Sequence, residues 1–101
     1  MSLFNYQPNY KVKSIHKIQK HKDKYVMFYS SWCSYSQAAM DKIKTSGELY
    51  RFYDIDIVPD GLNAVLKSLN EKPEMTGFNQ SHTTRPIIFY KGKFICGYSD
   101  L

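Results

Sequence analysis

The hydrophobic residues change their spacing along the chain, and each spacing predicts a different element. Val12, Ile15 and Ile18 recur at every third position among lysines, which predicts an amphipathic helix over residues 10–22. The next apolar residues form one short continuous run at residues 25–29 (YVMFY). Such a run is typical of a strand that is buried on both faces, as in a parallel sheet.

The rest of the chain continues with further helix and strand patterns. Residues 37–44 are rich in helix formers, and residues 48–57 are rich in β-branched and aromatic residues, so a helix and then a strand are predicted. Residues 62–69 place Leu and Val on one helical face. Residues 71–84 are polar and indicate mostly loop, and residues 87–96 predict a β-hairpin around a Lys-Gly turn.

This order of elements predicts an α/β fold. A strand–helix–strand unit gives a parallel pair and a hairpin adds an antiparallel pair, so we expect a mixed four-stranded sheet flanked by helices. The 101 residues are expected to form a single domain, with an extended lead-in at residues 1–9. The longest apolar run has five residues, so we expect neither a membrane-spanning helix nor a secretory signal peptide.

The net charge of +5 is concentrated near one end, where six lysines lie between Lys11 and Lys24 against the acid Asp23. Such a cluster is either a surface for nucleic acid or acidic lipid, or a solvated helix face. The solvated face is favoured, and no aromatic stacking platform for a nucleic-acid single strand is interleaved with the lysines. Neither a nucleic-acid nor a membrane partner is expected. Two cysteines, Cys33 and Cys96, are too few for a disulfide scaffold or a Cys-type structural zinc site, which favours a reducing, cytoplasmic compartment.

Cys33 is the informative residue for chemistry. It directly follows the buried strand and opens a helix, where unpaired backbone N–H groups and the helix dipole favour a thiolate over a thiol. A thiolate is the reactive form of cysteine. The alternative is that Cys33 is a small buried hydrophobic residue.

Three segments in order carry a resemblance to a known family. Residues 25–36 are an apolar strand that leads into Trp-Cys-Ser-Tyr-Ser, residues 84–86 are Thr-Arg-Pro, and residues 97–101 are Gly-Tyr-Ser-Asp-Leu. In these segments the chain resembles glutaredoxins of the thioredoxin fold, which have a C-x-x-C or C-x-x-S site, a Thr-Val-Pro with a cis proline, and Gly-Gly-x-Ser-Asp-Leu. The match covers about residues 12–101.

The resemblance implies a glutathione-dependent disulfide oxidoreductase with Cys33 as its catalytic nucleophile. Its substrates would be glutathionylated proteins or small disulfides, with glutathione as co-substrate and no metal. Ser36 stands where dithiol members have a second cysteine, and a serine cannot resolve a disulfide, so the implied mechanism is monothiol. Ser36 is expected either to donate a hydrogen bond toward the thiolate or to be merely a polar helix residue.

The resemblance also assigns residues to the parts of glutathione. Tyr35 would flank the sulfur, the alternative being core packing, and the backbone of Arg85 would pair with the cysteinyl backbone. Asp100 would accept a hydrogen bond from the γ-glutamyl ammonium, and N–H groups near Ser99 would hold the neighbouring carboxylate. The implied glutathione-binding residues are Tyr35, Thr84, Arg85, Pro86, Gly97, Ser99 and Asp100, with Asn63 and Cys96 as further candidates.

The chain departs from the family pattern in several places. Ser30 stands where a basic residue is usual, and Arg85 replaces the usual valine but could supply a charge instead. The family's C-terminal helix is missing from the sequence, which would leave part of a sheet face bare. His82, near the expected site, either tunes the thiolate or has no role.

Two other functions compete with redox catalysis. In one, two chains hold a [2Fe–2S] cluster through two Cys33 thiolates and two glutathiones, as an iron–sulfur carrier. Members with that task usually have Gly-Phe where this chain has Ser34-Tyr35, so redox catalysis by a monomer is favoured. In the other, a redox-inactive adaptor binds an acidic partner, which the presence of Cys33, Pro86 and Asp100 together disfavours.

Overall fold

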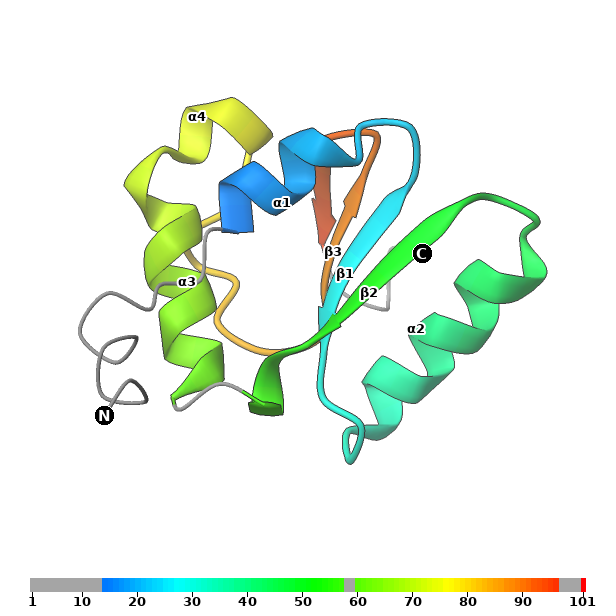
Figure 1. The fold of residues 1–101 in the computed structure, drawn as a ribbon. Coiled ribbons are helices and arrows are strands. Elements are labelled where there is room, and N and C mark those ends of the chain that lie inside the picture. The colour runs from blue at the N-terminus through cyan, green and yellow to red at the C-terminus, as the bar shows by residue number, and fades with distance from the viewer. Residues whose placement is uncertain (1–13, 58–59, 97–100) are drawn as a thin grey trace, which may run out of the picture.

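The computed structural model describes residues 14–57, 60–96 and 101, and its strands form one sheet (Figure 1). The strands are β1 (Tyr25–Tyr29), β2 (Tyr50–Asp54), β3 (Ile87–Tyr90) and β4 (Lys93–Cys96). Their order is β2-β1-β3-β4, with β1 and β2 parallel and the other two pairs antiparallel. The predicted mixed four-stranded sheet is confirmed.

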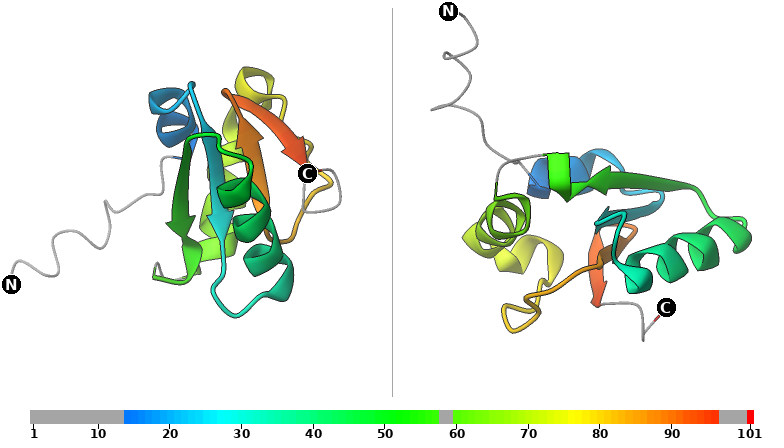
Figure 2. Two further views of the ribbon diagram at one scale, coloured as in Figure 1. Left: turned by 90° about the vertical axis from the view of Figure 1, so that its right-hand side faces the viewer. Right: turned by 90° about the horizontal axis from the view of Figure 1, so that it is seen from below.

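Helices pack on both faces of this sheet, as the two views of Figure 2 show. Helices α1 and α3 share a core with one face, and α2 packs on the other. The helical elements are α1 (Ser14–Lys20), α2 (Ser34–Thr45), the 3-10 helix η2 (Ile55–Ile57), α3 (Gly61–Glu71) and α4 (Pro73–Thr76). None of the helices in the described part of the chain is long and apolar enough to cross a membrane.

The central strands β1 and β3 divide their side chains between two cores. Val26 and Phe28 face the core shared with α1 and α3, whereas Met27 faces the core under α2. On β3, Ile88 likewise points away from its two neighbours, because successive side chains of a strand alternate between faces. Burial on both faces explains why each strand is a continuous apolar run, as predicted.

Several predicted boundaries are corrected. Helix α2 begins at Ser34 rather than at residue 37, and α1 ends at Lys20, two residues early. Strand β2 is shorter than residues 48–57, because its end tightens into η2. The segment expected to be mostly loop contains α4, which opens with a proline, a residue well suited to the first helical turn.

The predicted hairpin is confirmed. Lys91 and Gly92 both have positive φ, 51° and 87°, which is the conformation of a tight two-residue turn that matches strand twist. The lead-in expected at residues 1–9 lies outside the described residues. On the α2 face, the side chain of Leu101 packs against the core of that face.

Candidate functional site

Cys33 lies at the junction between β1 and α2, as predicted. It is the N-cap of α2, with extended backbone (φ −90°, ψ 121°), and its carbonyl accepts the first helical hydrogen bond from Gln37 N at 3.1 Å. Its own N–H donates to Ser30 O at 3.1 Å. The Gln37 side chain donates to Ser31 O, which braces the turn from the helix side. The thiol is thereby fixed at the helix N-terminus.

The surroundings of this half-buried thiol favour its ionised form. Burial raises the pKa of Cys33, but the N–H and hydroxyl of Ser36, the N–H of Tyr35 and the charge of Arg85 outweigh it, and the net pKa lies below its ordinary value. The sulfur makes no capping hydrogen bond of ordinary geometry, so these groups act on it mainly as dipoles at the helix end. The expectation of an activated thiol is supported.

Ser36 is a buried part of a polar connection beneath the thiol. Its side chain is fully buried, and its hydroxyl accepts a hydrogen bond from Ser30 N at 3.3 Å. The Ser30 hydroxyl in turn donates to Asp56 Oδ1 at 3.1 Å, which ties η2 to the end of β1. Ser36 therefore links the two ends of the active turn and is not merely a polar helix residue.

A second segment reaches the thiol from the loop before β3. The Arg85–Pro86 peptide bond is cis, as the resemblance implied, and Pro86 is buried. The Cys33 sulfur lies 4.0 Å from the backbone oxygen of Arg85, although the two residues are 52 positions apart. Thr84, at the start of this motif, is exposed. The fold thus brings two of the three motifs together.

The Arg85 side chain lies beside the active turn. Its Cζ is 4.8 Å from the centre of the Trp32 ring, the geometry of a cation–π contact. Its Nε is buried and has no hydrogen-bond partner among the described residues. The ring of Trp32 and that of Tyr35 are 68% and 63% exposed, so core packing of Tyr35 is excluded. The sequence suggests a charge at this position, but nothing in it indicates the contact with Trp32.

The remaining candidates are not brought to the thiol by described contacts. Asn63 is exposed on α3, and its Nδ2 donates to Asp60 Oδ1 at 2.9 Å. Cys96 ends β4, and its side chain lies outside the described residues, as do Gly97, Ser99 and Asp100. Within the described part of the chain, no three His, Cys, Asp or Glu side chains could share a metal ion.

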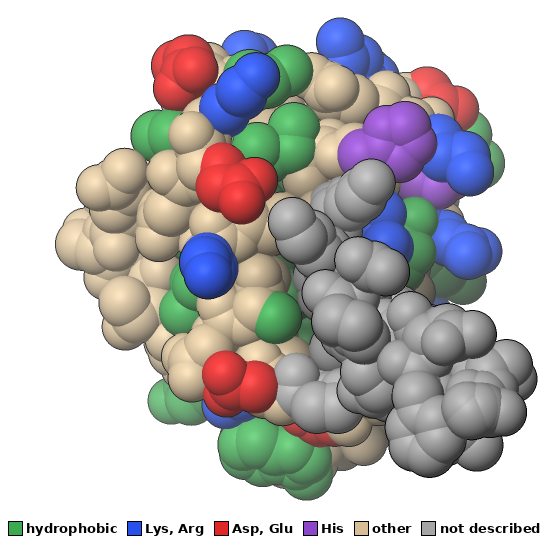
Figure 3. All heavy atoms as spheres, turned by 60° about the vertical axis from the view of Figure 1, so that its left-hand side comes forward, with side chains coloured by type: hydrophobic (Ala, Val, Ile, Leu, Met, Phe, Trp, Pro, Cys, Tyr) green, Lys and Arg blue, Asp and Glu red, His purple; other side chains and the backbone are tan. Residues whose placement is uncertain are grey.

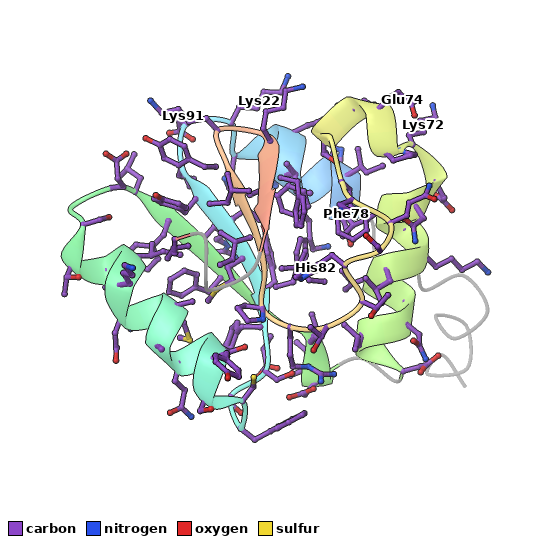
Figure 4. All side chains as sticks on the ribbon, turned by 180° about the vertical axis from the view of Figure 1, so that it is seen from behind. Lys22, Lys72, Glu74, Phe78, His82 and Lys91 are labelled. Carbon is purple, nitrogen blue, oxygen red and sulfur yellow. The ribbon has the colours of Figure 1, made fainter. Side chains whose placement is uncertain are left out.

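His82 supports the loop that carries the cis proline. Its Nε2 lies 3.1 Å from the Pro86 carbonyl oxygen, which can only accept, so Nε2 carries the proton and donates. The ring packs edge-on against Phe78 and Phe94, with centroids 6.4 and 5.3 Å away, and Figure 4 shows His82 and Phe78 on the segment between α4 and β3. A histidine four residues before the proline is the signal in the sequence that could have suggested this role.

Of the predicted basic cluster, Lys20, Lys22 and Lys24 lie at the other end of β1 from the thiol, and Lys11 and Lys13 lie outside the described residues. Burial, and then the charges of Lys24 and Arg51, lower the pKa of His21, which indicates concentrated positive charge there. Lys22 and Lys91 lie near each other at this end (Figure 4), and Figure 3 shows His and Lys or Arg side chains together at one edge of its face. The cluster is therefore separate from the site.

Comparisons with known proteins find a related sequence and similar folds. The chain is 38% identical over 77 residues to a protein named probable glutaredoxin from Acanthamoeba polyphaga mimivirus, covering 76% of this chain and 73% of that protein. No protein-family profile matches the chain.

Solved structures are also similar. A buckwheat glutaredoxin–glutathione complex has a TM-score of 0.62 at 25% identity, covering 86% of this chain and 74% of that one. A dithiolic glutaredoxin from Trypanosoma brucei brucei has a TM-score of 0.66 at 23% identity, covering 90% and 84%. The holo form of glutaredoxin C1 from Populus tremula x tremuloides has a TM-score of 0.63 at 20% identity, covering 86% and 73%. These likenesses confirm the thioredoxin-like fold.

Proposed function

Because the chain belongs to the glutaredoxin family of glutathione-dependent oxidoreductases, we propose that it reduces glutathione mixed disulfides by a monothiol mechanism through Cys33. The observation that carries the proposal is the position of the Cys33 sulfur, at the N-terminus of α2 and 4.0 Å from the backbone oxygen of Arg85. The lowered pKa of this thiol supplies the thiolate that attacks a disulfide.

The reaction consists of two exchanges. The Cys33 thiolate attacks the glutathione sulfur of the mixed disulfide, a new S–S bond to glutathione forms, and the substrate leaves as a thiolate that takes up a proton. A second glutathione thiolate then attacks the glutathione sulfur on Cys33. Glutathione disulfide is released and the Cys33 thiolate returns, so glutathione is oxidised and the substrate reduced.

The residues that hold glutathione are proposed from their placement around the sulfur. Strand β3 begins at Ile87, so the backbone groups of Arg85 lie outside the sheet ladder and are available to the cysteinyl part of glutathione. Tyr35, exposed on α2 two residues after Cys33, is proposed to flank the glutathione sulfur. Thr84 and Pro86 complete the loop. Gly97, Ser99 and Asp100 are proposed for the γ-glutamyl end on the family pattern alone.

The chemistry near Cys33 supports a monothiol route. Ser36 stands where dithiol members have their second cysteine, and a serine cannot form a disulfide. Cys96 pairs with Ile88 on the edge strand β4, which lies two strands, or about 10 Å, from the strand β1 that leads into Cys33. A disulfide needs Cα atoms within about 7 Å. Resolution by glutathione is therefore favoured over resolution by Cys96.

The test is glutathione-coupled reduction of a small glutathione mixed disulfide. We expect turnover in the parent protein, essentially none in Cys33→Ser, and most of it retained in Cys96→Ser. Absence of turnover in the parent would refute the enzyme and leave cluster binding or an adaptor role. An intramolecular disulfide in the oxidised parent, together with an inactive Cys96→Ser, would replace the monothiol mechanism by a dithiol one.

A further inference from the structure

The guanidinium of Arg85 is a cation without a counter-charge in the described part of the site. No described carboxylate lies within ion-pair distance of it, and no group in the described part of the chain is hydrogen-bonded to its buried Nε. The carboxylate that the fold brings to the end of β1, that of Asp56, accepts a hydrogen bond from Ser30 instead. Buried donors without a partner are rare in native proteins, and those that occur call for a specific explanation such as a bound ligand.

Two contacts hold this cation next to the nucleophile. Its Cζ lies 4.8 Å from the centre of the Trp32 ring, and the backbone of the same arginine contacts the Cys33 sulfur at 4.0 Å. The charge also helps to lower the pKa of Cys33, which places it within electrostatic reach of the sulfur. An arginine that stacks on an aromatic ring still presents N–H donors at the edge of its planar guanidinium, and two of these donors can bind both oxygens of a carboxylate.

We propose that Arg85, held on Trp32, binds a carboxylate of the incoming disulfide and makes this protein selective for carboxylate-bearing thiols. The inference rests on the proposed function, because the carboxylate is carried by the disulfide substrate. The carboxylate belongs either to the glutathione half or to the other half of that disulfide. Arg85 is then a specificity-determining residue, in addition to its backbone contact with the thiol.

Alkylation tests this without any turnover. Iodoacetate and iodoacetamide differ by one carboxylate charge, and the ratio of their rates at Cys33 cancels the fraction of thiolate. In a Cys96→Ser background, Arg85→Gln is expected to lower the iodoacetate-to-iodoacetamide ratio by roughly three- to tenfold, the effect of one unit charge about 6 Å away at intermediate to high dielectric. Arg85→Lys should retain part of the ratio.

A matched control separates this local effect from net charge. Lys44→Gln removes one charge from the far end of α2, eleven residues or about 16 Å from Cys33, and should leave the ratio unchanged. If Arg85→Gln slows both reagents equally, the arginine acts only on the thiolate and the proposal is wrong. Should Arg85→Gln fail to fold, the parent ratio must still fall as salt rises from about 0.02 to 0.5 M; a constant ratio would overturn the proposal.

Substrates then identify the source of the carboxylate. One pair is the glutathione–hydroxyethyl disulfide and its glycine-amidated analogue, and the other is the glutathione mixed disulfides of mercaptoacetate and mercaptoacetamide. If the carboxylate substrate of one pair is preferred over its amide, and Arg85→Gln removes the preference by raising the KM of the carboxylate substrate, the carboxylate belongs to that half of the disulfide. If neither pair shows a preference, the proposed selectivity is refuted. If the parent turns over normally but the iodoacetate-to-iodoacetamide ratio does not depend on Arg85, this inference alone is refuted. If the parent shows no turnover but the ratio does depend on Arg85, the proposed function alone is refuted.

Discussion

The hydroxyl of Ser36 offers the sharpest test of how the thiol is activated. Ser36→Ala removes that hydroxyl and leaves both backbone N–H groups at the start of α2 in place. Because the hydroxyl is one of the groups that lower the pKa of Cys33, the variant should have a higher thiol pKa than the parent. Alkylation, which needs the thiolate, should slow at pH values below the pKa.

The magnitude follows from the strength of the lost contact. A hydrogen bond to a charged group contributes about 1.5–3 kcal/mol, and the contact between Ser36 and the sulfur is looser than ordinary geometry, so the low end applies. About 1.4 kcal/mol corresponds to a tenfold change in the acidity constant. Alkylation at low pH should therefore slow by up to tenfold, while the parent and variant rates converge above both pKa values.

The same substitution has a cost in folding stability. Ser30 N donates to the Ser36 hydroxyl at 3.3 Å within the protein, and alanine leaves that buried donor without an acceptor. The free energy of unfolding should fall by roughly 1–2 kcal/mol, measured by urea denaturation of the reduced protein. A loss of reactivity without this loss of stability would mean that the polar connection beneath the thiol contributes little to the fold.

The assay is iodoacetamide alkylation against pH, in a Cys96→Ser background so that one thiol reacts. Ser34→Ala is the matched control, because Ser34 is exposed in the same first turn and its hydroxyl makes no hydrogen bond with a described residue. An unchanged rate profile in Ser36→Ala would show that backbone groups and Arg85 suffice. An equal change in Ser34→Ala would assign the effect to the helix end as a whole.

Four further outcomes are expected. His82→Ala removes the donor to the Pro86 carbonyl and two ring contacts, so turnover should fall and the free energy of unfolding should drop by about 1–3 kcal/mol in urea melts. Gly61→Ala would place a Cβ 1.6 Å from the Ile55 carbonyl oxygen, so the free energy of unfolding measured by calorimetry should fall by roughly 2–4 kcal/mol. Folding lowers the pKa of Cys33, so at pH values between its folded and unfolded pKa the unfolded state binds more protons. The free energy of unfolding of the reduced protein should therefore rise with pH across that window, and this rise should be absent in Cys33→Ser. Anaerobic reconstitution with iron, sulfide and glutathione should leave a nearly colourless monomer by gel filtration, and a brown dimer that depends on Cys33 would favour the iron–sulfur carrier.

The features predicted well from sequence depend on neighbouring residues. The continuous run of residues 25–29 identifies β1, and the polar turn after it places Cys33 at a helix start. Both follow from burial and helix-end chemistry within about ten positions of the chain. The Lys-Gly pair likewise fixes the hairpin turn, because both residues must adopt positive φ.

The features that were missed depend on contacts between distant segments. Helix α4 is a single turn whose formation depends on packing rather than on periodicity, so a polar stretch with Pro73 and Gly77 was expected to be mostly loop. The bond between Ser30 and Asp56 joins residues 26 positions apart, and nothing in the local pattern of either one indicates it. Long-range pairings of polar side chains have no period, so only the folded chain reveals them.

Activation of the thiol depends mainly on its own helix start, whereas the proposed selectivity depends on a distant segment of the chain. The donors that favour the thiolate come mainly from Tyr35 and Ser36, within three residues of Cys33, and any cysteine at such a helix start would meet the backbone part of them. Arg85 arrives from 52 positions away through the cis-proline loop and rests on Trp32. Arg85 is the smallest of the influences that lower the pKa of Cys33, so substitutions at Arg85 should raise the KM for carboxylate-bearing disulfides by more than they slow alkylation by neutral reagents.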